Sequence, residues 1–300
     1  MGLDWEEALE EILNLGLNPI RLGAYWSEIE KGKGEYNFSL LDREIQAISR
    51  QKASIVLVVG VKSPRWPEFY LPLWLREKLS LRPQQTLEKS LIGHYLFPFL
   101  EKTVKRYRHQ QTITHFQVEN EPLNFSGPQW LRLGPELLAN EVEFVRNITQ
   151  KPIILNSWVE MNPRRRAERN LTLKEKSLET CLRLADILGL SVYPSYPGQP
   201  KIEEKDWQIF GEWLKRARKL KKEAWVIEMQ AEPWPKEGEG KNFKDPYGNL
   251  SCSPNRVKYN FAKLQNLGFE TILLWGSEFW LRCAKENNTL WLECVQGLIG

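Results

Sequence analysis

The stretch Thr112–Pro122, TITHFQVENEP, decides how the rest of the sequence is interpreted. β-Branched and aromatic residues fill it, Glu121 follows them, and a proline ends it, which is typical of a buried strand presenting an acid at its end. Residues 223–233, EAWVIEMQAEP, have the same design, because an apolar run leads to Glu228 and stops near Pro233. Two strands that each end in a glutamate predict a pair of carboxylates in one site.

Strands and helices alternate along the chain around these two stretches. The apolar run at 54–61, SIVLVVGV, is typical of a parallel strand buried on both faces. A helical apolar spacing covers 4–16, with Asp4 placed as the N-cap. We expect the other strands at 18–25, 112–121, 152–159, 186–194, 223–230 and 269–276. Seven strands alternating with helices predict a parallel sheet covered by helices.

An open doubly wound sheet and a closed (β/α)₈ barrel share this alternation, so the positions of unusual side chains must distinguish them. Six such side chains each come from the carboxyl end of a different predicted strand: Arg21, Lys62, Glu121, Tyr193, Glu228 and Trp275. In a closed barrel these strand ends converge on one mouth, where such enzymes carry out catalysis, whereas an open sheet would spread them along an edge. We therefore expect an α/β fold, a (β/α)₈ TIM barrel, as a single domain over residues 1–300.

Composition narrows the class of function. The chain has 42 Lys+Arg against 38 Asp+Glu, a net charge of +4, and its basic residues are scattered, so we expect no nucleic-acid partner. Four cysteines show no CxxC spacing, three histidines share no metal-ligand spacing, and no glycine-rich phosphate loop is present, so we expect no metal and no cofactor. Neither a signal segment nor an apolar run of membrane-spanning length occurs. The chain as given is expected to be cytoplasmic, unless an N-terminal export or anchor segment is missing.

The chain contains 13 tryptophans, an unusual number for 300 residues. Indole rings pack in protein cores, and their flat faces also stack on the C–H groups of pyranose rings. Both interpretations stay open at Trp66, Trp234 and Trp275, which lie beside a proline or at a strand end.

Paired glutamates suit the cleavage of glycosides. One carboxylic acid must protonate the leaving oxygen, and a carboxylate must lie on the other face of the anomeric carbon. Three βα units separate Glu121 from Glu228, which places them about opposite each other in an eight-stranded barrel. The charge of Glu228 would favour the protonated form of Glu121 until Glu228 is glycosylated. Single strand-end acids are common on surfaces, so this hypothesis depends on the pair.

Two neighbouring glutamates, Glu119 and Glu232, are rivals for these roles. Glu121 is preferred because an asparagine precedes it and a proline follows it. Glu228 is preferred because Glu232 lies past the apolar run.

The Asn-Glu-Pro motif at 120–122, together with the second glutamate, resembles the clan A retaining glycoside hydrolases, a group of cellulase- and β-galactosidase-like TIM-barrel glycosidases. The resemblance implies a (β/α)₈ barrel and hydrolysis by double displacement. It implies an acid/base at Glu121, binding of the sugar 2-hydroxyl by Asn120, a nucleophile at Glu228, an arginine beneath it at Arg21, a tyrosine hydrogen-bonded to it at Tyr193, and a platform under the reactive sugar at Trp275.

Further residues could line a sugar pocket. Lys62 and Trp66 follow the third barrel strand, and Gln230 and Trp234 follow the proposed nucleophile. A polar loop stiffened by proline would have the same composition, so that alternative remains. The predicted partner is an oligosaccharide, a polysaccharide or a glycoside, whose sugar and linkage cannot be derived from these residues.

The sequence departs from the clan A pattern at its start. Such barrels begin with a strand, whereas this chain begins in the predicted helix at 4–16. We therefore expect an incomplete barrel that lacks its first strand, either because the start is truncated or because another segment fills the gap. An alternative function is a degenerate barrel that binds carbohydrate without turnover. A metal-dependent barrel hydrolase would need a cluster of His and Asp at strand ends, which we do not find.

Overall fold

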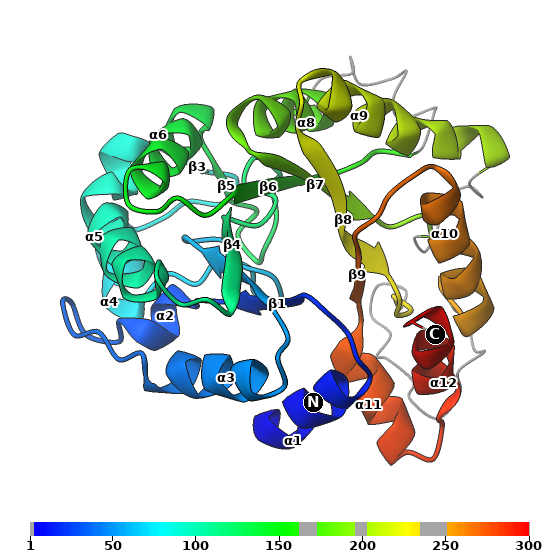
Figure 1. Cartoon of the computed structure of the whole chain (residues 1–300). Coiled ribbons are helices and arrows are strands. Elements are labelled where there is room, and N and C mark those ends of the chain that lie inside the picture. The colour runs from blue at the N-terminus through cyan, green and yellow to red at the C-terminus, as the bar shows by residue number, and fades with distance from the viewer. Residues whose placement is uncertain (1–2, 162–172, 196–202, 235–250, 300) are drawn as a thin grey trace. The chain divides into compact units, whose positions relative to one another are not determined.

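The structure is a computed structural model that describes residues 3–161, 173–195, 203–234 and 251–299 (Figure 1). It contains two compact units. The Glu121 unit consists of Asn18–Trp158 and Thr172–Leu188. The Glu228 unit consists of Met1–Leu17, Val159–Leu171 and Gly189–Gly300. The single domain expected over residues 1–300 stays a prediction.

Four parallel strands of the Glu121 unit pair in the order β1-β2-β4-β6. Their bounds are Ile20–Gly23 for β1, Ile55–Val59 for β2, Ile113–Val118 for β4 and Ile153–Trp158 for β6. All of β2 is completely buried, as its continuous apolar run predicts. Two short strands, β3 (Thr86–Leu87) and β5 (Arg132–Leu133), form a separate parallel pair.

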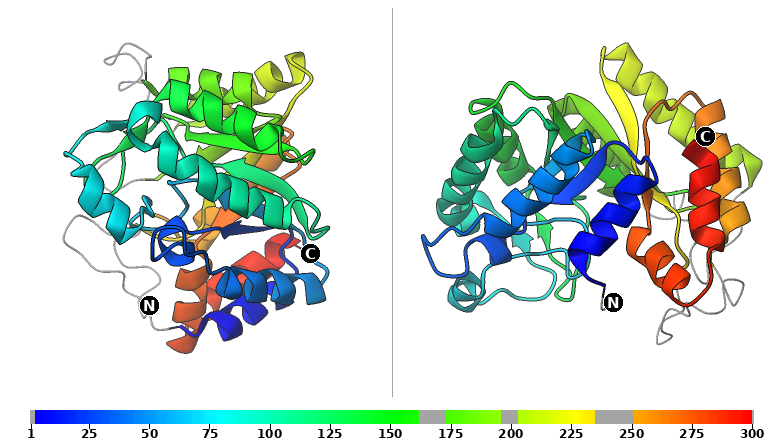
Figure 2. Two further views of the ribbon diagram at one scale, coloured as in Figure 1. Left: turned by 90° about the vertical axis from the view of Figure 1, so that its left-hand side faces the viewer. Right: turned by 60° about the horizontal axis from the view of Figure 1, so that its bottom comes forward.

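Helices cover the outer face of these strands, as Figures 1 and 2 show. In the described part of this unit they are α2 (Trp26–Ile29), α3 (Ser39–Arg50), α4 (Leu73–Leu79), α5 (Lys89–Tyr107), α6 (Pro135–Arg146) and α8 (Leu173–Leu184). Helix α5 packs on β2, α6 on β4 and α8 on β6. Helix α6 turns Leu138, Val142 and Val145 to the interior, and it also buries Glu141 there.

The Glu228 unit is built around β8 (Glu223–Gln230), which pairs in parallel with β9 (Ile272–Trp275). Its described helices are α1 (Trp5–Asn14), the 3₁₀ turn η1 (Glu204–Trp207), α9 (Gln208–Lys219), α10 (Pro254–Asn266), α11 (Ser277–Lys285) and α12 (Leu290–Ile299). Asp4 caps α1 as predicted, because its side chain accepts hydrogen bonds from the backbone N–H groups of Glu6 and Glu7 at 3.0 and 3.1 Å.

The remaining strand, β7 (Ile187–Val192), begins in the Glu121 unit and ends in the Glu228 unit. The strand order β1-β2-β4-β6-β7-β8-β9 follows the order of the sequence, which confirms the seven predicted strands. Helices separate successive strands of this parallel sheet, as in a TIM barrel. The described part of the chain supplies seven strands of this sheet in place of eight, which fits an incomplete barrel. Within the described residues, α1 is the first element and no strand precedes it.

Two details differ from the sequence-based expectations. Strand β4 ends at Val118, whereas the prediction extended it to Glu121. The reason is local, since Glu119 and Glu121 have positive φ angles of 63° and 45°, which a strand does not allow. Helices α2, α4 and α11 and the short strands β3 and β5 were not predicted either.

Candidate active site

A turn of three residues, Glu119–Glu121, follows β4 and presents the Asn-Glu pair. Left-handed φ angles at two non-glycine residues in three are strained, and surrounding contacts must impose them. The backbone N–H of Glu119 donates to the carbonyl of Val59 at 2.8 Å, and that of Asn120 donates to the carbonyl of Lys62 at 2.7 Å. The N–H of Glu121 donates to Asn156 Oδ1 at 2.9 Å. All three N–H groups of the turn are therefore held by neighbouring strands or the segments that follow them.

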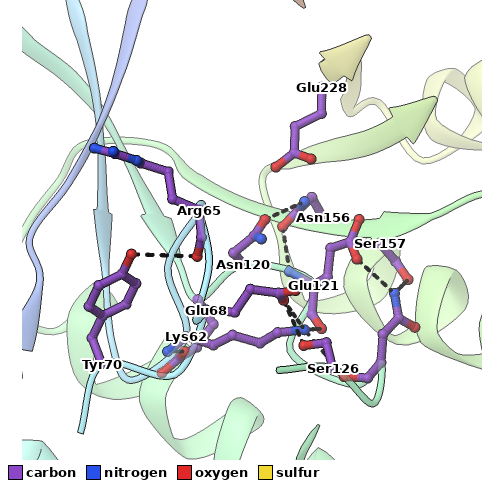
Figure 3. A network of polar contacts seen from close by, with 12 residues as sticks. Lys62, Arg65, Glu68, Tyr70, Asn120, Glu121, Ser126, Asn156, Ser157 and Glu228 are labelled. Carbon is purple, nitrogen blue, oxygen red and sulfur yellow. Dashed lines mark hydrogen bonds and ion pairs between the residues drawn. The ribbon is translucent and has the colours of Figure 1, made fainter. Parts of the chain in front are cut away.

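The side chain of Asn120 has a fixed orientation (Figure 3). Its Oδ1 accepts hydrogen bonds from Arg21 Nη2 at 2.7 Å and from Asn156 Nδ2 at 3.0 Å. Arg21 is itself oriented, since its Nε donates to Gln117 Oε1 at 2.8 Å. Because both donors engage the oxygen, the Nδ2 of Asn120 is the group left for a ligand, and no acceptor meets it in the described part of the chain. An oriented amide donor of this kind suits a sugar hydroxyl.

Lys62 lies inside the loop that follows β2, with 0% of its side chain exposed. Its Nζ donates to the backbone carbonyls of Glu121 at 2.8 Å and Asn124 at 3.2 Å, and it forms an ion pair with Glu68 at 3.4 Å. Ser126 Oγ donates to the same Glu68 carboxylate at 2.6 Å (Figure 3). The ammonium group therefore fixes the path of the chain on both sides of the Asn-Glu-Pro motif. This burial favours a positioning role over direct contact with a sugar.

The carboxyl group of Glu121 is partly exposed. Asn124 Nδ2 lies 3.4 Å from its Oε2 and 3.3 Å from Ser157 Oγ. On the loop after β2, Trp66 is 70% exposed and so presents its indole to solvent. An accessible acid beside an oriented amide is the arrangement that a general acid requires.

Glu119, the rival of Glu121, is completely buried. Its Oε1 accepts from the N–H of Val61 at 2.7 Å, and its Oε2 accepts from the N–H of Lys62 at 2.5 Å. Gly60 makes room for this carboxyl, because a Cβ built there would lie 2.1 Å from Glu119 Oε1, and its φ of +125° also requires glycine. A carboxyl enclosed in this way does not reach a substrate, which favours Glu121 as the acid.

In the Glu228 unit, Glu228 lies in strand β8, where the register with β9 shifts between Val226 and Met229, and it is only 6% exposed. Tyr193 Oη donates to Glu228 Oε2 at 2.8 Å, which is the contact that the clan A resemblance implies. The Tyr193 ring packs against Trp234 with 4.7 Å between ring centroids. A phenol that donates to a carboxylate stabilises its ionised form.

Gln230 is completely buried two residues after Glu228. Its side-chain amide donates to the carbonyl of Ser195 at 2.9 Å and accepts from the N–H of Ser195 at 3.2 Å. This pairing joins the ends of two chain segments, so the geometry favours a positioning role for Gln230 as well. Trp275 ends β9 opposite Gln230 and is partly exposed. Trp234 is held through its backbone N–H, which donates to Ser251 Oγ at 2.6 Å.

Sequence reasoning missed three residues of the Glu121 unit: Gln117, Asn156 and Glu141. Gln117 links Arg21 to the turn, because its Nε2 donates to the carbonyl of Glu119 at 2.7 Å and to Asn156 Oδ1 at 2.9 Å. A signal did exist for Gln117 and Asn156, since each is a polar residue within a predicted buried strand. Such residues are buried only when they are hydrogen-bonded, which makes them candidates for a site.

Two further searches concern only the described residues. No group of three or more His, Cys, Asp or Glu side chains is arranged to hold a metal ion. None of the helices in this part of the chain combines the length and the apolar character needed to cross a bilayer.

Comparison with known proteins agrees with the fold and the motif. Residues 3–127 match the model of glycoside hydrolase family 42, described as beta-galactosidase. Beta-galactosidase BgaA of Clostridium cellulovorans is 25% identical over 133 residues, which cover 39% of this chain and 19% of BgaA. The matched family segment contains Arg21, Lys62, Trp66, Asn120 and Glu121. These findings confirm the resemblance to clan A glycoside hydrolases.

Solved structures of glycosidases have the same fold. A beta-galactosidase from Halorubrum lacusprofundi aligns with a TM-score of 0.60 at 12% identity, over 90% of this chain and 50% of that one. A GH5_18 protein from Streptomyces cattleya in complex with GlcNAc gives 0.62 at 12% identity, over 90% and 64%. Xylanase 10B from Thermotoga petrophila in complex with xylobiose gives 0.60 at 14%, over 98% and 91%.

This chain spans about a fifth of BgaA and half of the haloarchaeal beta-galactosidase. Its fold is the barrel fold of these glycosidases, and its residues 3–127 are similar to the family 42 model.

Proposed function

We propose that this chain is a retaining glycosidase that cleaves a β-linked glycoside by double displacement. One observation carries the proposal. Hydrogen bonds fix the Asn120 side chain and the Glu121 backbone after β4, and both residues lie inside the segment that matches the beta-galactosidase family. Glu121 is the acid/base and Glu228 is the nucleophile.

The proposed reaction has two steps. Glu121 gives its proton to the glycosidic oxygen while the carboxylate of Glu228 attacks the anomeric carbon, so the leaving alcohol departs and a glycosyl ester forms on Glu228. Glu121, now ionised, removes a proton from water, which attacks the same carbon and releases the sugar and Glu228. Each group ends in the state in which it began.

Three neighbours assist these steps. Asn120 donates its Nδ2 hydrogen to the sugar 2-hydroxyl, an interaction that strengthens in the transition state of such reactions. Arg21 fixes the amide of Asn120 through the 2.7 Å bond to Oδ1. Tyr193 orients the carboxylate of Glu228 through the 2.8 Å bond to Oε2.

The first candidate substrate is a β-galactoside, because the family match and BgaA both carry that name. Aromatic faces for stacking a sugar ring are proposed at Trp66, Trp234 and Trp275. Trp66 is the most exposed of the three, at 70%.

Hydrolysis of a panel of aryl β-glycosides, with the β-galactoside first, tests the proposal. Proton NMR of the early reaction should show the β-anomer of the free sugar before mutarotation. If the α-anomer appears first, the reaction inverts, and the double displacement is excluded. If no glycoside is cleaved but a sugar binds in calorimetry, the chain is instead a carbohydrate-binding barrel.

A further inference from the structure

The Glu121 unit buries a second carboxyl group against Glu119. Glu141, in the middle of α6, is 0% exposed, as is Glu119. The two carboxyl groups face each other closely enough that each shifts the pKa of the other. Neither Glu141 oxygen accepts a hydrogen bond from an N–H or hydroxyl group in the described part of the chain. Two buried carboxylates side by side repel each other strongly when both are ionised, and no donor among the described residues meets Glu141, so the pair is favoured when one of the two carries a proton.

The surroundings determine which carboxyl holds that proton. Both oxygens of Glu119 accept backbone N–H groups, from Val61 and Lys62, and the Lys62 ammonium lies nearby, all of which favour a charge on Glu119. Burial, and then the charge of Glu119, raise the pKa of Glu141 well above its usual value. Burial also raises the pKa of Glu119 to about 7, and the hydrogen bond from Glu141 opposes that rise.

We propose that Glu119 and Glu141 form a positioning pair for Glu121, in which protonated Glu141 donates to ionised Glu119 and thereby locks the turn after β4. This inference rests on the proposed function in one respect, the role of Glu121 as the acid/base. Ionised Glu119 connects the segment after β2 to the turn. Its carboxylate accepts from the N–H groups of Val61 and Lys62, and its own N–H donates to the carbonyl of Val59 at 2.8 Å. Lys62 then holds the carbonyl of Glu121 from the same segment.

The charged groups around the pair are few and come from three places. Lys62 faces Glu119 from the segment after β2, and Glu141 faces it from α6. Glu68 shares the Lys62 ammonium, and Glu121 follows on the turn itself. Above about pH 7 Glu119 is ionised and only the Glu141 proton remains in the pair. Loss of that proton at higher pH would set two buried negative charges side by side and would release the turn.

Two substitutions at Glu141 distinguish its role as a hydrogen-bond donor from its role in filling space. Glu141→Gln supplies an amide N–H to Glu119 without a titrating proton, so kcat should stay within about twofold of wild type. Glu141→Met fills similar volume but donates nothing, so kcat should fall by about 10- to 100-fold, the loss expected of a misplaced acid, while KM stays within about twofold. Glu143→Gln, on the exposed side of the same helix, is the matched control and should match wild type.

Infrared difference spectroscopy detects the proton directly. At a pH above 7, wild type and Glu143→Gln should show one more component in the carbonyl stretch of protonated carboxylic acids than Glu141→Gln, in which the components of other protonated groups such as Glu121 stay. The melting temperature of Glu141→Gln should also exceed that of wild type by a margin that grows with pH, because only wild type must keep the proton bound.

Several outcomes would overturn the pair. They are a Glu141→Gln spectrum with every carboxylic-acid component of wild type, a Glu141→Met enzyme as active as Glu141→Gln, and a melting-temperature difference that does not change with pH. The infrared and melting measurements need no substrate. If wild type cleaves no glycoside, the proposed function fails, while these two measurements still decide whether the pair holds its proton.

Discussion

Glu121 and Glu228 are presented in different ways. Glu228 lies within strand β8, between Val226 and Met229 where the register with β9 shifts, and the Tyr193 hydroxyl donates to its carboxylate. Glu121 lies three residues beyond the end of β4, on a turn with two left-handed φ angles. Its position depends on Asn156, which binds its N–H, and on Lys62, which binds its carbonyl.

The positions of Glu228 and Glu121 are thus determined by different kinds of contact. A strand residue inherits its position from the sheet, and few additional contacts are needed. A residue on a strained turn needs buried polar groups from several neighbouring elements, and these make its position sensitive to single substitutions. In the proposed mechanism the nucleophile must be fixed along one line of attack, whereas the acid/base serves two different oxygens in two steps.

Substituting the two glutamates should give the largest effects and should separate their roles. Glu121→Gln should lower kcat about 10²–10⁴-fold on a glycoside with a poor leaving group, because such a group must be protonated. On a dinitrophenyl glycoside its first step should stay near wild type, since that leaving group needs no proton. Glu228→Gln should abolish measurable turnover of both substrates. Burst and steady-state kinetics on the two substrates provide the measurement.

Exposed glutamates on helices serve as controls for these variants. Glu143→Gln in the Glu121 unit and Glu212→Gln in the Glu228 unit should both keep wild-type rates. If Glu121→Gln and Glu228→Gln respond alike to the leaving group, the assigned roles are wrong.

Removal of the Lys62 ammonium should have the next largest effect. Lys62→Met leaves the carbonyls of Glu121 and Asn124 without this donor and the Glu68 carboxylate without its ion-pair partner, so the free energy of unfolding should fall by about 3–5 kcal/mol. Urea unfolding measures it. Lys31→Met, at a side chain 76% exposed, should change it by less than about 1 kcal/mol. An equal loss from both variants would contradict the buried role of Lys62.

Tyr193→Phe should have a smaller effect and should act on rate more than on stability. A hydrogen bond to a charged group contributes about 1.5–3 kcal/mol, so kcat/KM should fall by about 10- to 100-fold. The melting temperature should change little, because β8 still places Glu228. A large drop in melting temperature with unchanged kcat/KM would show that Tyr193 supports the fold instead.

The smallest effect is expected from substitution of Glu44 on α3. Its carboxyl belongs neither to the contacts of Glu121 nor to those of Glu228. Burial raises the pKa of Glu44 from 4.5 to about 7, and the charge of Arg65 opposes this rise. A raised carboxyl pKa gives stability that is present at low pH and lost as pH rises through about 7. Glu44→Gln should therefore gain melting temperature relative to wild type above about pH 7 and none near pH 4.5, with unchanged kcat. A gain that is equal at both pH values would exclude this titration.

The sequence predicted the regular elements well because their signals are local. The apolar run of β2, the cap at Asp4 and the strand carrying Glu228 each depend on residues that lie side by side in the chain. Helix α11 was not predicted, although Phe279, Trp280 and Cys283 line its buried face. It begins at Ser277, directly after the strand that ends at Trp275, so no loop separates the two apolar segments. The seven-stranded order then followed from alternation alone.

The geometry of the turn could not be predicted in the same way. The φ angles of Glu119 and Glu121 depend on partners distant in sequence, among them Val61, Lys62 and Asn156. The sequence also suggested Glu119 as a simple rival of Glu121, whereas the structure encloses it. A carboxyl whose partners come from other strands carries no local signal of its burial.

The burial of Lys62 also has a chemical consequence. A lysine whose amine is enclosed and donates to two carbonyls is shielded from acylating reagents while the loop stays closed. Mild acetylation followed by mass spectrometry would thus mark exposed lysines first, and a modified Lys62 would report that the segment bearing Glu121 had opened. Acetylation of Lys62 can therefore serve as a footprinting probe for the displacement of Glu121.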